Sequence, residues 1–256
     1  MIVFLHIPKT AGTTFQFILE NSFGISHCHT NHTNKKVFGQ EDLDFARRIF
    51  PRLRSIAGHN IIDPLALRVP DPFHMTFLRE PISRVFSHYQ DTVLRGGNRT
   101  DFETSLRSNE ELENLAVKLM AGSRDLDKAK RFLMQCGFVG LTENFELSLH
   151  VLSRLSPYGL NLNYRRKVVA RDNTLKQSLA RDPRMVQMAR DHNLLDLELY
   201  AFAVHEVFPA LCARAGFSPS QQVVSFDKYT RELQPKFLLS RFFNMSLYRQ
   251  ICKRRR

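Results

Sequence analysis

The chain has 256 residues, of which 43% are hydrophobic and 24% charged, with a net charge of +12 and a pI near 9.9. This composition excludes an intrinsically disordered protein, and no apolar run is long enough to cross a membrane as a helix. The positive charge favours anionic ligands. The length predicts one domain over residues 1–256, in which residues 216–256 form a C-terminal extension.

Apolar and amphipathic segments alternate along the chain. Runs that predict buried strands lie near residues 2–7, 24–28, 55–59, 74–79 and 138–141. Helical patterns lie near residues 13–22, 41–50, 81–94, 110–121, 124–135, 143–154, 176–190 and 193–215. The glycines of segment 93–101 predict a surface loop. The alternation predicts an α/β fold: a P-loop-like parallel sheet with helices on both faces and a helical C-terminal part.

A short polar loop joins the first predicted strand to the first predicted helix. The N–H groups that begin a helix, together with its dipole, attract an anion. Gly12 lets the backbone approach a ligand closely, and Lys9 supplies a positive charge. The loop therefore predicts a phosphate site, whose residues would be Lys9, Thr10, Ala11, Gly12, Thr13 and Thr14.

A second anion site is predicted after the strand near residues 74–79. Arg79 ends this strand, and Ser87 follows eight residues later, in a helix that Pro81 begins. Open α/β sheets bind ligands at the carboxyl ends of their strands. An arginine fork and a hydroxyl at that edge suit a phosphate group.

The loop is not a Walker A motif, because its lysine precedes its only glycine by three residues. It resembles the 5′-phosphosulfate loop of sulfotransferases that use PAPS (3′-phosphoadenosine 5′-phosphosulfate). Its sequence, His-Ile-Pro-Lys-Thr-Ala-Gly-Thr-Thr, is similar to that of the branch that contains the heparan sulfate 2-O- and 6-O-sulfotransferases. The resemblance implies PAPS as co-substrate, no required metal, and Arg79 and Ser87 on the 3′-phosphate. Weaker similarities at residues 114–122, 138–143 and around Asp196 extend it over residues 1–205.

Sulfuryl transfer to a hydroxyl needs a general base, and histidine suits neutral pH. His59 follows a short apolar strand, on the rim that is predicted to carry Lys9 and Arg79. In the resembled 2-O-sulfotransferases a glycine-histidine pair at this place carries the base. We therefore expect His59 and Lys9 to be catalytic, with Lys9 neutralising the leaving oxygen. His6 is the second candidate for the base, although its place in a strand favours packing.

Two other functional classes remain open at this stage. A P-loop-type kinase of a small metabolite would need a magnesium-binding acid, and the missing Walker A motif argues against it. A polyanion-binding protein without catalytic activity would explain the charge. Nucleic acid is disfavoured as a partner because no motif interleaves basic and aromatic residues.

The expected acceptor carries a hydroxyl group, and a carbohydrate is favoured. Basic residues at Arg165, Arg166, Lys167 and Arg171, and from Lys253 to Arg256, point to an anionic glycan, although a solvated surface would explain them equally well. The sequence carries no signal for a particular oligomeric state. The chain opens on its first strand, which predicts a soluble, cytoplasmic, bacterial-like protein, or a Golgi-lumenal one if an anchor precedes it.

Overall fold

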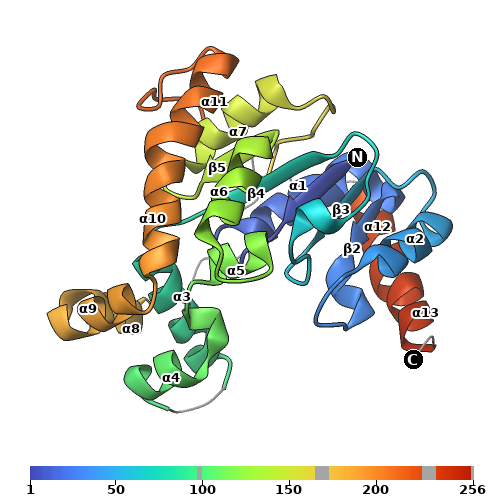
Figure 1. Ribbon diagram of the computed structural model, residues 1–256. Helices are drawn as coiled ribbons and strands as arrows, with labels where there is room; N and C mark the ends of the chain where they lie inside the picture. The colour runs from blue at the N-terminus through green and yellow to red at the C-terminus, as the bar shows by residue number, and fades with distance from the viewer. Residues whose placement is uncertain (97–99, 165–172, 227–234, 255–256) are drawn as a thin grey trace.

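A computed structural model describes residues 1–96, 100–164, 173–226 and 235–254. Its centre is a five-stranded sheet in the order β2-β3-β1-β4-β5, and every neighbouring pair is parallel (Figure 1). The strands are β1 (Ile2–Leu5), β2 (His27–His29), β3 (Ser55–Gly58), β4 (Phe73–Leu78) and β5 (Phe138–Leu141). Helices cover both faces of the sheet. The predicted α/β fold is confirmed, and the carboxyl ends of these strands share one edge of the sheet.

Helices connect the strands and continue beyond the sheet. The α-helices are α1 (Gly12–Phe23), α2 (Gln40–Ile49), α3 (Pro81–Leu94), α4 (Phe102–Ser108), α5 (Leu115–Ala121), α6 (Leu126–Gln135), α7 (Phe145–Leu155), α8 (Thr174–Arg181), α9 (Pro183–Asp191), α10 (Leu194–Phe202), α11 (Phe208–Ala215), α12 (Pro235–Arg241) and α13 (Arg249–Arg254). Short 3-10 turns are η1 (Gly24–Ser26), η2 (Thr30–Thr33), η3 (Pro64–Ala66) and η4 (Glu110–Leu112), and π-helical turns are η5 (Ala203–Val207) and η6 (Phe242–Tyr248).

The main core surrounds β1. All four residues of β1 are fully buried, as expected for a parallel strand that is covered on both faces. On α1, Phe15, Ile18 and Leu19 recur at helical spacing and are also fully buried. The ring of Phe15 packs edge-on against that of Phe4, which fixes the direction in which α1 leaves the strand.

A smaller core lies apart from the sheet, where α3, α4, α8 and α9 meet. It consists of Ile82, Val85, Phe86, Tyr89, Phe102, Leu106, Leu112, Leu179 and Ala189. In Figure 1 these helices form a group of their own beside the sheet. The group holds α8 against α3, and this packing matters for the site described below.

Several predicted boundaries were wrong. The first strand ends at Leu5 instead of residue 7, and the strand expected at 24–28 is η1 followed by β2. The helix expected over 176–190 is two helices, because Asp182 precedes a proline and adopts an extended conformation that caps α9. Helices α4, α12 and α13 were not predicted. The loop expected at 93–101 begins after α3 ends at Leu94, and residues 97–99 lie outside the described residues.

The helix expected over 110–121 is broken at Asn114, whose φ of 42° is left-handed. The break serves a reciprocal cap between α5 and α10. Asp196 accepts hydrogen bonds from the N–H groups of Ala116 and Val117 at 3.0 and 2.9 Å. In return, the Asn114 side chain accepts from the N–H groups of Leu195 and Asp196 at 3.0 and 3.1 Å. Each helix therefore satisfies the free N–H groups of the other.

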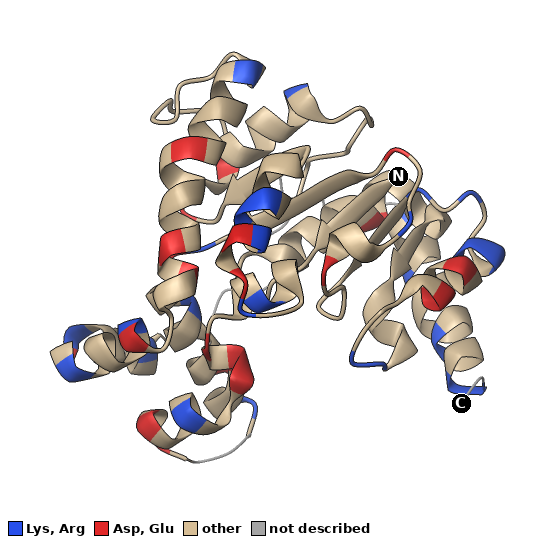
Figure 2. Ribbon diagram, viewed as in Figure 1, with Lys and Arg blue, Asp and Glu red and all other residues tan. Residues whose placement is uncertain are grey.

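The segment from α12 to α13 packs along α1 and the edge strand β2. Phe237 contacts Phe17 of α1 with ring centroids 4.9 Å apart. The Asn244 side chain donates to the carbonyl of His27 at 2.8 Å and accepts from the N–H of His29 at 2.9 Å, so it occupies the free edge of β2. Figure 2 shows Lys and Arg, but no Asp or Glu, on α13. Among the described helices, none is both long and apolar enough to cross a membrane.

Candidate active site

The loop between β1 and α1 is shaped by two left-handed residues, Lys9 with φ 69° and Ala11 with φ 62°. The hydroxyl of Thr10 donates to the carbonyl of Ile7 at 2.8 Å and closes the turn from inside. The carbonyl of Ala11 accepts from Thr14 and Phe15, whereas the N–H groups of Gly12 and Thr13 have no backbone acceptor among the described residues. These two free N–H groups begin α1, where an anion is most favoured.

A cleft of about 640 Å³ opens in front of this loop. The predicted residues Lys9, Ala11, Gly12, Thr13, Thr14, Arg79 and Ser87 all line it. Thr10 does not, because its side chain is buried and turned inward. The structure thus brings both predicted phosphate sites to one cleft at the carboxyl edge of the sheet.

Arg79 links the two ends of the cleft. Its guanidinium donates to the carbonyl of Lys9 at 3.1 Å, so the end of β4 holds the phosphate loop directly. Burial lowers the pKa of Arg79, and the neighbouring carboxylates Glu143 and Glu80 oppose that shift. The partly buried guanidinium is a strong site for an anion because little water competes for it.

The second wall of the cleft contains residues that the sequence did not single out. Lys176 of α8 lines it, and burial, followed by the charge of Arg79, lowers the pKa of Lys176. The N–H of Lys176 donates to the side chain of Gln90 at 3.0 Å, which ties α8 to α3. On α3, Asp91 lies 3.5 Å from the ammonium of Lys9. The pattern of α8 predicted a helix, but nothing in it indicated contact with a cleft formed by residues about a hundred positions earlier.

The predicted base, His59, is exposed and lies beside the cleft instead of lining it. Its ring is 4.0 Å, centroid to centroid, from that of His6. The Nδ1 of His59 lies 2.6 Å from the carbonyl oxygen of His6. A carbonyl only accepts hydrogen bonds, so Nδ1 carries the proton and Nε2 keeps its lone pair in the neutral ring. Desolvation by the surrounding protein lowers the pKa of His59, which favours this neutral form.

His6, the second candidate for the base, is buried and joins His59 to the phosphate loop. Its ring packs on Gly12 so closely that a Cβ added there would lie 1.9 Å from the ring carbon Cδ2. Burial lowers the pKa of His6 well below its usual value. The absence of a side chain at Gly12 therefore has a packing reason as well as the expected one of backbone approach to a ligand.

A second hollow, of about 330 Å³, adjoins the cleft on the side of β2 and shares Thr13 with it. It is lined by Thr13, Gln16, Phe17, Glu20, His29, His32, Arg241, Asn244 and Met245. Within it the buried carboxylate of Glu20 lies 2.6 Å from His29. In the part of the chain that the structure describes, no three metal-ligating side chains cluster here or elsewhere.

The sequence of the chain was compared with models of protein families. Residues 1–203 match the model of a sulfotransferase family. The chain belongs to that family. The match includes the phosphate loop, His59, Arg79, Ser87 and Lys176, and it ends where η5 begins. No curated protein is similar enough in sequence to count as a relative.

Membership supports sulfuryl transfer in general, and sulfotransferases generally take their sulfuryl group from PAPS.

Most of the basic residues that pointed to an anionic acceptor lie outside the described residues. They are Arg165, Arg166, Lys167, Arg171, Arg255 and Arg256. Lys253 and Arg254 belong to α13.

Proposed function

We propose that the protein is a PAPS-dependent O-sulfotransferase in which His59 is the general base. The observation that carries this proposal is the cleft itself. A single cleft presents the free N–H groups of α1, the ammonium of Lys9, the guanidinium of Arg79, the hydroxyl of Ser87 and the ammonium of Lys176. Several cationic and hydrogen-bonding groups around one cleft suit a nucleotide with a phosphate at its 5′ side and another at its 3′ side.

In this proposal the acceptor hydroxyl attacks sulfur while His59 Nε2 takes its proton. The bond from sulfur to the bridging oxygen breaks, and 3′,5′-ADP leaves with the electron pair. Lys9 neutralises the charge that develops on that oxygen. His6 holds His59 through its carbonyl, so the histidine that packs against the loop also orients the base.

The acceptor would approach from the side of β3 and β2, where His59 and the second hollow lie. The polar lining of that hollow, with Gln16, Glu20 and Arg241 near the ring of Phe17, suits the hydroxyl groups and apolar faces of a carbohydrate. Arg241 would favour a sugar that carries a carboxylate or sulfate. This agrees with the resemblance of the loop to the heparan sulfate branch. A kinase is disfavoured by the family match.

Calorimetry with nucleotides tests the donor. We expect 3′,5′-ADP to bind at least tenfold more tightly than 5′-AMP or ATP. Ser87→Ala and Arg79→Ala should each weaken the binding of 3′,5′-ADP. For Arg79→Ala the loss should be about 1.5–3 kcal/mol, because a charge-assisted contact is lost. Arg214→Ala, an exposed change on α11, is the matched control. Equal affinity for 3′,5′-ADP and 5′-AMP would refute the assigned 3′-phosphate site.

Transfer of labelled sulfuryl groups tests the acceptor. Wild-type protein, PAPS and either a uronic-acid polysaccharide or a neutral glycan would be compared at two salt concentrations. The anionic glycan should be the better acceptor, and its advantage should shrink in high salt because exposed charges are screened within about 8–10 Å. Equal transfer to both, insensitive to salt, would contradict an anionic acceptor and leave the donor assignment standing.

A further inference from the structure

The helical segment of residues 235–254, which comprises α12, η6 and α13, carries an unusual concentration of exposed apolar side chains. Among the described residues, eleven large hydrophobic side chains are exposed, and five belong to this segment: Leu238, Leu239, Phe242, Met245 and Leu247. Phe242 is 68% exposed. An apolar row of this kind marks an interaction surface more often than an isolated exposed leucine does.

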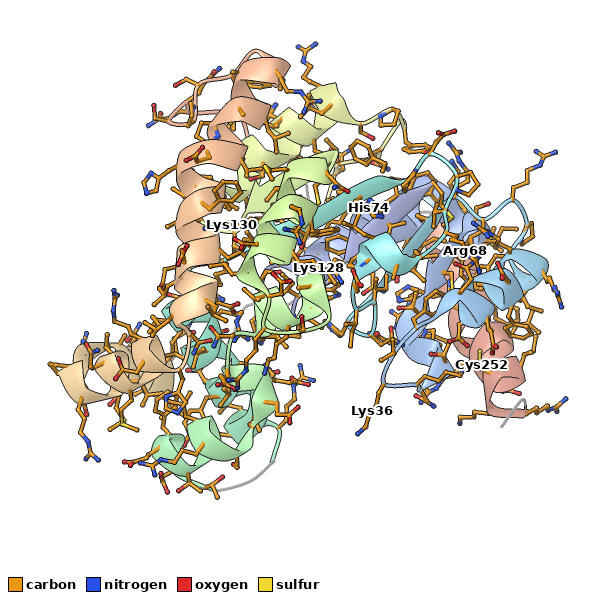
Figure 3. All side chains as sticks on the ribbon, viewed as in Figure 1. Lys36, Arg68, His74, Lys128, Lys130 and Cys252 are labelled. Atoms are coloured by element: carbon orange, nitrogen blue, oxygen red, sulfur yellow. The ribbon has the colours of Figure 1, made fainter. Side chains whose placement is uncertain are left out.

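The orientation of this row is set by the opposite side of the segment. Phe237, Asn244 and Tyr248 are buried against α1, β2 and α2. Cys252, labelled in Figure 3, is the buried side chain on α13. With these residues buried, Leu238 and Phe242, four positions apart and therefore on one helix face, point away from the protein.

All the charged side chains of the segment are positive. It has no aspartate or glutamate, and it carries Lys236, Arg241, Arg249, Lys253 and Arg254. Exposed aromatic and aliphatic side chains combined with lysine and arginine on one helix are the pattern of helices that lie in the plane of a membrane surface.

We propose that the segment of residues 235–254 docks the protein on an anionic lipid surface. The exposed apolar side chains would enter the boundary between headgroups and acyl chains, and the cations would meet the lipid phosphates. A second copy of the chain is a poorer occupant, because the segment carries five cations and no acidic residue, so two copies of it would repel. Arg241 and Met245 also line the second hollow, so the test below uses Leu238, Phe242, Arg249 and Lys253, which line neither that hollow nor the cleft.

Sedimentation of the full chain with lipid vesicles tests this inference. Wild-type protein should bind vesicles of phosphatidylglycerol and phosphatidylcholine in equal parts, and bind phosphatidylcholine vesicles weakly. The double change Leu238→Ser with Phe242→Ser should weaken binding roughly tenfold or more. Arg249→Gln with Lys253→Gln should weaken it by about fivefold per cation at low salt.

Matched controls separate this surface from the rest of the molecule. Leu194→Ser, on α10, removes a side chain that is 62% exposed, and Arg190→Gln removes a cation from α9; both should bind like wild type. All of the substituted side chains are exposed. Unchanged thermal unfolding therefore confirms that each variant is folded. Absence of binding at low salt, or variants of residues 238–253 that bind like wild type, would overturn the proposal. So would a dimer in sedimentation equilibrium that Phe242→Ser dissociates.

Discussion

The imidazole of His59 has its tautomer set by a backbone carbonyl. Because His6 offers only an acceptor to Nδ1, the lone pair of the neutral ring is on Nε2. The backbone N–H of His59 also donates to the side chain of Asn31 at 2.9 Å, which fixes the residue at the end of β3. A histidine that is neutral, oriented and exposed has the properties that the proposed general base requires.

The first prediction at this scale concerns pH. The base must be unprotonated, and the pKa of His59 is lowered from its usual value of 6.5. In the proposed mechanism, the acid limb of kcat/KM should therefore be centred below that pH. The acid limb is measured from initial rates with PAPS and a working acceptor. A limb centred above pH 6.5 would argue against His59 as the base.

Substitution of the same residue completes this test. His59→Ala should lower kcat by about 10²–10⁴, the usual contribution of a general base, and should remove the acid limb. Its affinity for 3′,5′-ADP should be unchanged, because His59 does not line the cleft that is proposed to bind the nucleotide. His205→Ala, an exposed change on η5, is the control. If His59→Ala retained normal turnover, the base would have to be sought elsewhere, and His6 would be next.

At the scale of elements, one wall of the cleft is formed by α8, which the smaller core holds in place. Leu179 fixes α8 among the residues of α3 and α4, and this packing carries Lys176 to the edge of the cleft beside Arg79. The break at Asp182 and Pro183 separates α8 from α9, and both helices contact α3. The position of α8 therefore shapes one wall of the cleft.

We predict that Lys176→Gln weakens the binding of 3′,5′-ADP by about fivefold to tenfold and leaves the binding of 5′-AMP almost unaffected. The reason is that Lys176 lies near Arg79, the residue proposed to hold the 3′-phosphate. Arg181→Gln, at the exposed end of the same helix, should change neither affinity. Calorimetry with both nucleotides measures the difference. An equal loss for 5′-AMP would place Lys176 at the 5′ side instead.

At the scale of the whole molecule, the C-terminal helices complete the sheet. β2 is an edge strand of three residues, and Asn244 supplies it with a donor and an acceptor that another strand would otherwise provide. Because Asn244 and Phe237 couple the last helices to α1 and β2, we propose that residues 1–256 fold as one cooperative domain, with 216–256 as an extension packed upon it.

Asn244→Ala should lower the free energy of unfolding by about 2–3 kcal/mol, because the two hydrogen bonds to β2 are lost and the backbone groups of His27 and His29 lose these partners. Ser246→Ala, an exposed change two residues further on, should be close to neutral. Urea unfolding followed by circular dichroism measures both, and one shared transition is expected. A separate early transition for the C-terminal helices would contradict the single cooperative domain.

The sequence alone was sufficient for the sheet, most helices and the phosphate loop. Apolar runs and helical periodicity depend on neighbouring residues, and the carboxyl ends of parallel strands meet at one edge wherever the strands lie. This is why Lys9 and Arg79, seventy positions apart, could be placed together and are joined by a hydrogen bond. The Asp182–Pro183 break and the Asp101 cap of α4 also had local signals, which the helical pattern obscured.

Other features were decided only by the tertiary structure. The left-handed turn at Asn114 is stabilised by residues about eighty positions away, on α10. Lys176 reaches the cleft through the smaller core, and the ring of His6 is held between Gly12 and His59. In residues 235–254, the packing against α1 and β2 decides which apolar side chains are buried and which stay exposed. Sequence periodicity records which side chains are apolar, whereas their partners depend on how every other element packs.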